Sequence, residues 1–139
     1  MRYHLSTKQK EVITKKISSY LSDQYQDIAF AYLFGSFVSE ELFNDIDAAV
    51  YMKNTDVNIL EFELDLEYRL EQAVEVQIDV RVINNAPIAF SQNVIRTGNL
   101  ILDKEPNLRA DFEGRILKQY FDFATFRRRY LADVENAPI

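Results

Sequence analysis

Two aspartates separated by a single residue, Asp45 and Asp47, carry the clearest chemical signal in this 139-residue sequence. Asp47 belongs to an alternating segment, 46–52, that predicts a β-strand, and the two-residue period of a strand turns both carboxylates to one side. Their backbones then stand roughly 7 Å apart. Carboxylates at this spacing suit Mg²⁺, which binds a few carboxylates together with water and substrate phosphates. Taken singly, Asp45 could cap a turn and Asp47 could lie solvated at a sheet edge.

A third aspartate, Asp79, lies in a later segment, 74–82, in which valine and isoleucine alternate with polar residues. This alternation predicts a strand with one buried and one polar face, and Asp79 lies on the polar face. A carboxylate in such a strand is costly to bury without a partner, which could be a metal or an ion pair with Arg81 or a lysine. If this strand neighbours that of Asp47, the three carboxylates converge in a site for two-metal phosphoryl or nucleotidyl transfer.

The residue types of the sequence leave few candidates for a general base. There is no cysteine, which excludes thiolate nucleophiles, disulfides and cysteine-based zinc sites. The single histidine, His4, has no second histidine to complete a metal pair and is expected at the surface. Asp79, close to a metal-bound hydroxyl, is therefore the candidate base.

A phosphate-binding turn is predicted ahead of the aspartates. Gly35 and Ser36 directly follow a short, uninterrupted apolar segment, 28–34, that is typical of a strand buried on both faces. A small turn at this place lets backbone N–H groups and a hydroxyl approach a phosphate closely. A Gly-Ser pair after a strand is by itself usually only a turn, and the aspartates that follow make this one a candidate nucleotide-binding element.

Helical patterns separate the strands. Ser6 to Gln9 forms a capping box, and apolar residues then recur at helical spacing, which predicts a helix over about 7–24. Residues 62–70 alternate as a strand would, but their composition and an apolar stripe from Ile59 to Ala73 favour a helix that crosses over between two strands of one sheet. We also expect a short helix over 87–96, an apolar run at 100–102 and one or two aromatic-rich helices over 106–133.

Composition bounds the class of protein. A chain of this length with 47% hydrophobic residues is the size of one domain, and no linker or repeat interrupts it, so we expect a single domain over 1–139. The net charge of −6 opposes binding to the phosphate backbone of DNA or RNA. The longest apolar stretch is too short for a membrane span and the amino end has no apolar signal core, so we expect a cytoplasmic protein without membrane contact.

The run Leu33-Phe34-Gly35-Ser36-Phe37, followed by Asp45-Ile46-Asp47 and by Asp79 in a later strand, resembles the nucleotidyltransferase (polymerase beta-like) superfamily. The resemblance is closest to the minimal, single-domain members (MNT) and extends through 78–87 and 98–102, so it covers most of the chain. It implies an α/β (α+β) fold with a small mixed β-sheet flanked by helices, in which 104–139 form a helical carboxy-terminal segment.

The resemblance also implies an activity, which is AMP transfer from ATP with two Mg²⁺ ions. It assigns Gly35 and Ser36 to the triphosphate, and Asp45, Asp47 and Asp79 to the metals. Minimal members are often encoded beside a HEPN-domain ribonuclease toxin, and some act as its antitoxin by adding AMP to a tyrosine of the toxin. The expected partner is therefore a HEPN toxin, which explains why so short a chain lacks an acceptor-binding domain of its own.

The connector between the turn and the aspartates departs from the family pattern. Residues 37–44 are fewer than in most relatives, Ser39-Glu40-Glu41 stands where a glycine is common, and Asn44 stands where a serine usually precedes the first aspartate. All the acidic ligands are present. We therefore expect this departure to alter phosphate affinity, the reaction rate and the nucleotide preference more than the type of reaction.

Two other functions share these features. A contact-only antitoxin with a weak or vestigial nucleotide site would dock through the aromatic carboxy-terminal segment and the basic Arg127–Arg129 cluster, although we expect core packing to account for most of these aromatic residues. The apolar residues in question are Phe112, Ile116, Tyr120, Phe123, Phe126 and Tyr130. A small-molecule nucleotidyltransferase has the same chemistry but needs more chain to hold its acceptor. A HEPN-type ribonuclease is excluded, because its Arg and His motif on a helix is missing.

Overall fold

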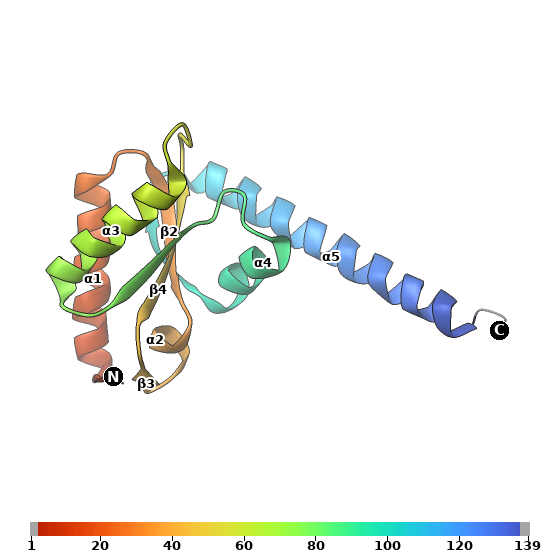
Figure 1. The fold of residues 1–139 in the computed structure, drawn as a ribbon, viewed down its shortest axis with the longest axis horizontal. Coiled ribbons are helices and arrows are strands. Elements are labelled where there is room, and N and C mark those ends of the chain that lie inside the picture. The colour runs from red at the N-terminus through yellow and green to blue at the C-terminus, as the bar shows by residue number, and fades with distance from the viewer. Residues whose placement is uncertain (1–2, 137–139) are drawn as a thin grey trace.

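A computed structural model describes residues 3–136. A small sheet carries helices on both faces, as an α/β fold requires, and the last helix extends away from the body (Figure 1). No described helix is both long and apolar enough to cross a membrane. In chain order the elements are β1 (Tyr3–His4), α1 (Thr7–Gln24), β2 (Ile28–Phe34), α2 (Ser36–Ser39), β3 (Leu42–Phe43), β4 (Ile46–Met52), α3 (Ile59–Val74), β5 (Ile78–Val82), α4 (Ile88–Thr97), β6 (Asn99–Asp103) and α5 (Pro106–Asn136).

The central sheet has four strands in the order β5-β4-β2-β6. β2 pairs antiparallel with β4 and with β6, whereas β4 and β5 are parallel, so the sheet is mixed. Parallel neighbours need a crossover connection, and α3 supplies it. This confirms the helix that the stripe from Ile59 predicted, and the crossover brings the strand of Asp79 beside the strand of Asp47.

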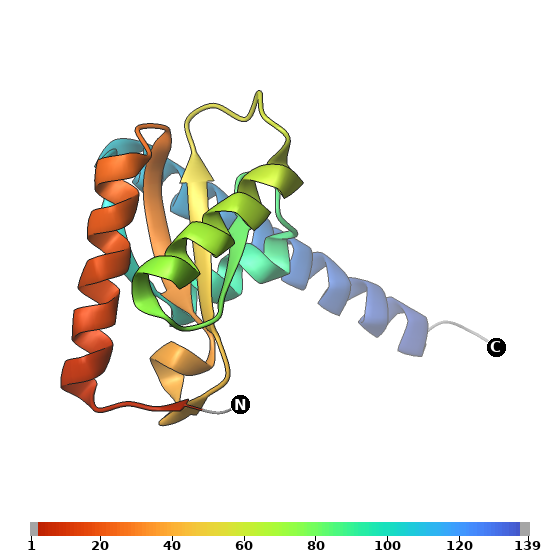
Figure 2. The ribbon, with the colours of Figure 1, turned by 60° about the vertical axis from the view of Figure 1, so that its left-hand side comes forward.

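Two apolar cores hold the layers together, one on each face of the sheet. α1 and α3 cover one face (Figure 2), where Ile17 and Leu66 are fully buried. α4 and the first part of α5 cover the other, where Phe112 packs against Phe30 and Tyr51 with ring centres 5.7 and 5.2 Å apart. β2 lies between the two cores and is buried on both sides, as its uninterrupted apolar run predicts.

The first helix begins where its sequence predicts. Ser6 Oγ accepts a hydrogen bond from Gln9 N at 3.1 Å, and Gln9 Oε1 accepts one from Ser6 N at 2.8 Å, which completes the capping box. Lys10 Nζ, in the first turns of α1, donates to the backbone oxygens of Phe37 and Glu40 at 2.8 and 2.7 Å. The helix therefore also fixes the connector that follows the Gly-Ser turn.

Three short elements, β1, α2 and β3, carry no periodic signal in the sequence. β1 and β3 pair antiparallel as a second, two-stranded sheet. Tyr3 stacks on Phe43 with ring centres 5.5 Å apart, and Phe43 meets Phe37 edge-on at 5.0 Å. These contacts hold α2, and with it Ser36, against the body. His4 is exposed, as expected.

The strand that carries Asp79 is shorter than its alternation predicts. β5 begins at Ile78, whereas Val74 is the last residue of α3 and Glu75 ends that helix in the left-handed region at φ 60° and ψ 29°. The prediction of a strand from Val74 was wrong, because burial at a helix end and in the connector after it mimics the alternation of a strand. Val74 and Val76 are both buried although neither lies in β5.

β5 is an edge strand, and glutamates of α3 rather than another strand satisfy its outward N–H groups. The three glutamates are spaced by four residues, so they share one face of the helix. We call them the carboxylate ladder. The bonds run from Ile78 N to Glu71 Oε1 at 3.1 Å, from Val80 N to Glu67 Oε1 at 3.3 Å and from Val82 N to Glu63 Oε2 at 2.8 Å. Because unpaired edge groups invite pairing with another chain, the ladder seals this edge and fixes β5 against α3.

The carboxy-terminal segment forms one helix, α5, whose first part belongs to the body. Phe112 and Ile116 are buried against the sheet. The Tyr32 hydroxyl donates a hydrogen bond to Glu113 Oε1 at 2.6 Å. Burial and this bond raise the pKa of Tyr32 well above its ordinary value, so the hydroxyl stays a donor and ties the helix to β2.

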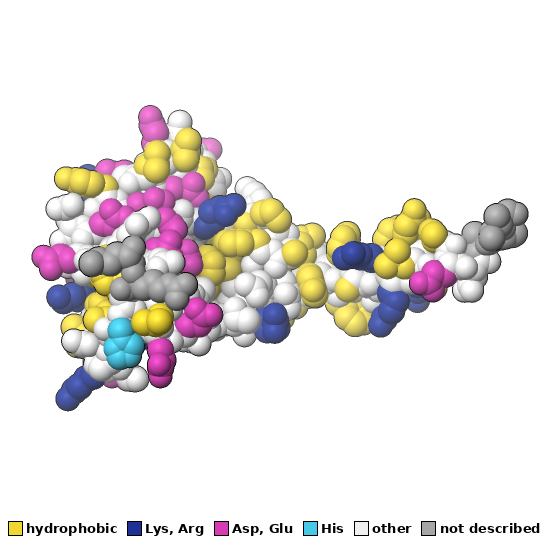
Figure 3. Space-filling model, turned by 60° about the horizontal axis from the view of Figure 1, so that its bottom comes forward, with side chains coloured by type: hydrophobic (Ala, Val, Ile, Leu, Met, Phe, Trp, Pro, Cys, Tyr) yellow, Lys and Arg dark blue, Asp and Glu magenta, His cyan; other side chains and the backbone are white. Residues whose placement is uncertain are grey.

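The second part of α5 leaves the body and exposes hydrophobic side chains (Figure 3), several of which are aromatic. Phe123, Phe126 and Tyr130 are 59%, 68% and 58% exposed, and the Arg127–Arg129 cluster beside them is exposed as well. The expectation that core packing accounts for most of the aromatic residues of this segment is therefore wrong. Packing against the sheet ends within the first three turns of the helix, and residues 137–139 of the predicted segment lie outside the described residues.

Candidate active site

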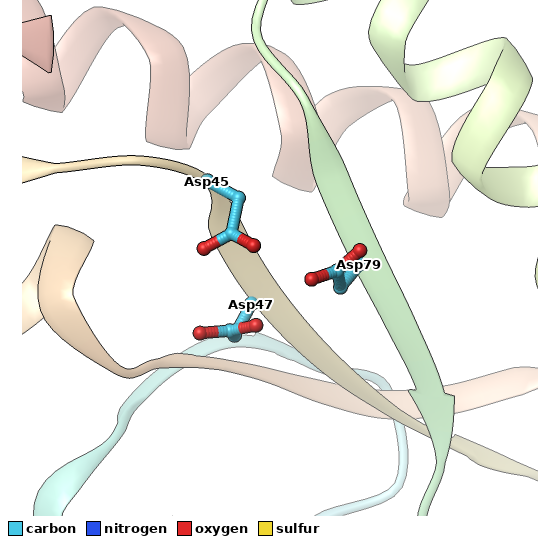
Figure 4. Close-up of side chains that lie close together, drawn as sticks. All are labelled: Asp45, Asp47 and Asp79. Atoms are coloured by element: carbon cyan, nitrogen blue, oxygen red, sulfur yellow. The ribbon is translucent and has the colours of Figure 1, made fainter. Parts of the chain in front are cut away.

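Three carboxylates gather at one end of the sheet, and they belong to the three aspartates that the sequence singled out (Figure 4). Asp45 immediately precedes β4, Asp47 is the second residue of β4, and Asp79 is the second residue of β5. Asp47 and Asp79 are register partners across the parallel pair, so their side chains emerge next to each other. One oxygen atom from each of the three residues lies within 4.8 Å of the others.

Gly35 lies directly against this cluster. Its backbone, at φ 78° and ψ −158°, occupies a region that is almost restricted to glycine. A Cβ atom at this position would collide with Asp47 Oδ2. The turn therefore requires glycine both for its dihedral angles and for the approach of the Asp47 carboxylate, and it sets Ser36 at the start of α2.

Negative charge is crowded in the cluster, and two of its carboxyl groups are weakened as acids. Burial, and then the charge of Asp45, raise the pKa of Asp47 from 3.8 to about 6. A hydrogen bond with Asp45, then burial, then the charges of Asp45, Asp47 and Glu67 raise the pKa of Asp79 to about 6. A bound cation relieves this repulsion, so the cluster favours a cation over protons at neutral pH.

The donor set fits a hard divalent cation. It consists of carboxylate oxygens without nitrogen or sulfur ligands, which suits Mg²⁺ better than zinc or copper. Asp45 and Asp47 are half-buried and Asp79 is exposed, so one side of the cluster is open to water and to a phosphate group. The arrangement can therefore hold metal ions while it leaves coordination positions for a substrate.

Asp79 does not form the ion pair that was the alternative explanation for a carboxylate in this strand. Among residues 3–136, no lysine or arginine lies within salt-bridge distance of it. Arg81, two residues further along β5, instead places its guanidinium 5.0 Å from the centre of the Phe90 ring in α4. The negative charge of the cluster is thus left for a ligand.

The acidic connector borders the turn. Ser36 lines a cavity of about 350 Å³ together with Glu40 and Glu41, the residues at which the sequence departs from the family pattern. Two carboxylates therefore stand close to the place expected for a triphosphate. Their negative charges oppose the binding of an anion there.

Two features beside the cluster were not predicted from the sequence. The carboxylate ladder had a signal, since Glu63, Glu67 and Glu71 recur every four residues on a predicted helix. Phe90 had none, because its contacts with Arg81 and Phe34 depend on where α4 packs on the sheet.

Comparisons with known proteins agree with this geometry. Residues 15–107 match the protein family described as polymerase beta, nucleotidyltransferase. A chain in the crystal structure of the toxin–antitoxin pair MntA–HepT has the same fold, with a TM-score of 0.68 and 23% identity over 90% of this chain and 98% of that chain. So does a chain in the complex of a tri-AMPylated Shewanella oneidensis HEPN toxin with MNT antitoxin, with a TM-score of 0.69 and 24% identity over 91% and 98%. A chain of a toxin–antitoxin structure with AMP-PNP gives a TM-score of 0.69 and 25% identity over 88% and 98%. No curated protein matches the sequence significantly.

Proposed function

The chain belongs to the polymerase beta nucleotidyltransferase family, and from this premise we propose that it transfers AMP from Mg-ATP to a hydroxyl of a partner protein. The observation that carries the proposal is the convergence of Asp45, Asp47 and Asp79 beside Gly35, with an oxygen of each aspartate within 4.8 Å of the others. Converging carboxylates of this kind are the ligand set of a two-metal transfer site.

In the proposed site, Asp45, Asp47 and Asp79 hold two Mg²⁺ ions. When bound, these ions neutralise the triphosphate and make the acceptor hydroxyl more acidic. Gly35 and Ser36 bind the triphosphate, because a turn without a side chain at residue 35 lets backbone N–H groups and the Ser36 hydroxyl donate to phosphate oxygens. The acidic connector weakens this contact relative to a glycine-rich one.

The proposed reaction forms one bond and breaks one. The acceptor oxygen bonds to the α-phosphorus of ATP, the bond from that phosphorus to the oxygen that bridges to the β-phosphate breaks, and pyrophosphate leaves. The proton of the acceptor hydroxyl passes to Asp79, which is the exposed member of the cluster. His4 lies in β1, outside the cluster, and takes no part.

The acceptor we propose is a tyrosine of a HEPN ribonuclease toxin, and the chain is then the antitoxin of the pair. The exposed aromatic residues and the Arg127–Arg129 cluster of α5 offer a surface for a protein rather than for a small molecule. The similar structures include a tri-AMPylated HEPN toxin with its MNT antitoxin and a toxin–antitoxin structure with AMP-PNP. Both of these neighbours support ATP as the substrate and a toxin as the acceptor.

In this proposal residues 1–139 are one nucleotidyltransferase domain, of which 104–139 form the segment that meets the partner. The proposed location is the cytoplasm, because both ATP and a ribonuclease toxin are found there. Contact with nucleic acid or membrane plays no role in the proposed activity.

A contact-only antitoxin is the second candidate, and the exposure of α5 is the observation that favours it. In this case α5 binds and blocks the toxin, and the carboxylate cluster is a weak or vestigial nucleotide site. The two candidates differ in what they require of the aspartates, since contact alone does not need them.

Protection of cells against the toxin separates the two candidates. We would co-express the HEPN toxin with the wild type, with the double variant Asp45→Ala/Asp47→Ala, or with Asp23→Ala/Asp56→Ala, which removes two exposed carboxylates elsewhere. If protection is enzymatic, Asp45→Ala/Asp47→Ala should no longer protect the cells, whereas Asp23→Ala/Asp56→Ala should protect them as the wild type does. Full protection by Asp45→Ala/Asp47→Ala would establish the contact-only function instead.

A further inference from the structure

Arg81 stands beside the carboxylate cluster, on the same face of β5 as Asp79 and two residues beyond it. Residues two apart in a strand point the same way and lie about 7 Å apart. In the register of the parallel pair, the row formed by Asp47 and Asp79 is followed by the row formed by Ala49 and Arg81. The backbone of Arg81 therefore lies one step along the sheet from the row that carries Asp47 and Asp79.

Phe90 of α4 fixes the position of this guanidinium. Its ring centre is 5.0 Å from Arg81 Cζ, and Phe34 meets the same ring edge-on at 5.5 Å. Phe34 is the register partner of Asp47 on β2 and directly precedes Gly35. Phe34, Phe90 and Arg81 thus form a continuous wall behind the cluster, which runs from the Gly-Ser turn to β5.

The rest of the Arg81 side chain is available to a ligand. It is exposed, and none of the ion pairs or side-chain hydrogen bonds within residues 3–136 involves it. It lines a cavity of about 350 Å³ between α3 and the start of α4, together with Glu63 and Pro87, and none of the three aspartates lines this cavity. A guanidinium carries five N–H donors on a planar group, so its single contact with the Phe90 ring leaves donors and guanidinium surface for a ligand. These surfaces suit a group that combines an aromatic ring with an oxygen.

We propose that Arg81 binds the acceptor: the segment that carries the acceptor tyrosine lies at this cavity, and the phenol ring lies along Arg81, outside the cavity, with its hydroxyl directed at Asp79. This inference rests on the proposed function. The triphosphate is assigned to Gly35 and Ser36, on the β2 side of the cluster, whereas Arg81 lies on the β5 side, so the two substrates approach the carboxylates from opposite sides.

The same geometry sets the choice of acceptor. The step of about 7 Å from Arg81 to Asp79 is comparable to the length of a tyrosine side chain. The hydroxyl of a serine or threonine held at Arg81 stops short of Asp79. The bonds formed and broken are those given above, and Arg81 takes no proton because a guanidinium stays charged. Its contribution is to bind and orient the ring.

Steady-state kinetics of AMP transfer to the HEPN toxin test this assignment. Initial rates are measured for the wild type, Arg81→Ala, Arg81→Lys and Arg96→Ala, with ATP varied at fixed toxin and toxin varied at fixed ATP. Arg96 is the matched control, since it is an exposed arginine in the last turn of α4. Arg81→Ala should lower kcat/KM for the toxin about tenfold, as expected for the loss of one cation–π contact, and leave KM for ATP within about twofold. Arg96→Ala should match the wild type.

The outcomes separate this inference from the proposed function. A rise in KM for ATP instead of KM for the toxin would show that Arg81 binds nucleotide phosphate and would overturn the inference, and so would wild-type kinetics in Arg81→Ala. If Arg81→Ala unfolds, Arg81→Lys decides, because it keeps the charge but loses the planar guanidinium and should still lose several-fold in kcat/KM for the toxin. Failure of the wild type to transfer AMP would be failure of the proposed function itself.

Discussion

The carboxylate of Asp47 occupies the space into which a side chain at position 35 would project. The sheet brings the two residues together, since Gly35 follows Phe34, which pairs with Asp47 across β2 and β4. The turn assigned to the triphosphate and the cluster assigned to the metals are therefore one geometric unit. A change at Gly35 must disturb both.

Gly35→Ala should destabilise the protein and impair the site together. An alanine at φ 78° is strained, and its Cβ collides with the Asp47 carboxylate, so we expect a loss of roughly 1–3 kcal/mol in the free energy of unfolding. Urea unfolding at pH 7 measures the loss, and Mg²⁺ binding should weaken in parallel. Gly114→Ala, in α5, is the control. Apart from the neighbouring backbone of the helix itself, no atom lies within 4 Å of the place that its methyl group would take, so it should instead stabilise the protein by about 0.5–1 kcal/mol. Equal effects of the two substitutions would contradict this account of Gly35.

Lowering the pH from neutral should stabilise the metal-free protein, because the carboxyl groups of the cluster become protonated. The pKa values of Asp47 and Asp79 are raised from 3.8 to about 6 in the folded state, so folding favours their protonated forms. Their contribution to stability is fully present below about pH 4 and is lost as the pH rises through about 6. Asp47→Asn, which cannot ionise, should therefore raise the melting temperature at pH 7.5 more than at pH 5, whereas Asp23→Asn should raise it at neither.

Magnesium should stabilise the protein at neutral pH more than at acid pH. Its ligands must be ionised, so Mg²⁺ should raise the melting temperature of the wild type at pH 7.5 and much less at pH 5. Asp47→Asn should remove most of this effect. A shift of the melting temperature that is the same at both pH values would place the metal somewhere other than at Asp47 and Asp79.

The carboxylate ladder should hold β5 in place through hydrogen bonds. Glu63→Ala leaves the Val82 N–H without its 2.8 Å partner, and we expect a loss of about 1–2 kcal/mol in the free energy of unfolding. Glu63→Gln keeps an acceptor oxygen and should recover a large part of that loss. Gln72→Ala, an exposed substitution on the same helix, should change stability by less than about 0.5 kcal/mol. Chemical denaturation compares all three variants, and an equal loss in Glu63→Ala and Gln72→Ala would show that the ladder contributes nothing.

The two parts of α5 should respond differently to substitution. Phe112 is 2% exposed, so Phe112→Ala should cost about 3–5 kcal/mol of stability. Phe126 is 68% exposed, and Phe126→Ser should leave stability within about 0.5 kcal/mol while it weakens the complex with the HEPN toxin. Calorimetric titration of toxin into each variant checks the second effect. Undiminished affinity in Phe126→Ser would remove this part of α5 from the partner surface.

Local patterns were enough to predict most elements of the fold. The capping box at Ser6 and the apolar run from Ile28 both gave elements with the bounds that the structure has. Periodicity and composition conflicted over 62–70, and helix propensity together with the need for a crossover decided correctly. The start of β5 was missed because the buried Val74 ends a helix and only looks like a strand residue.

The sequence predicted the members of the carboxylate cluster but not its surroundings. The period of a strand brings Asp45 and Asp47 to one side, and the crossover brings Asp79 beside them, so local rules suffice for this convergence. The contact of Arg81 with Phe90 depends on the packing of α4, for which the sequence contains no short-range signal. The exposure of α5 beyond Tyr120 could not be predicted for the same reason. An aromatic stripe at helical spacing does not show where the sheet beneath the helix ends.

The intact mass of the HEPN toxin after incubation with ATP, Mg²⁺ and this protein tests the central claim most directly. With the wild type, the mass should increase by one or more AMP groups, and fragmentation should locate them on tyrosine. With Asp45→Ala/Asp47→Ala, the mass should stay unchanged, and Asp23→Ala/Asp56→Ala should behave as the wild type. An unchanged mass with the wild type, in a sample in which the two proteins form a stable complex, would contradict AMP transfer and leave a contact-only antitoxin.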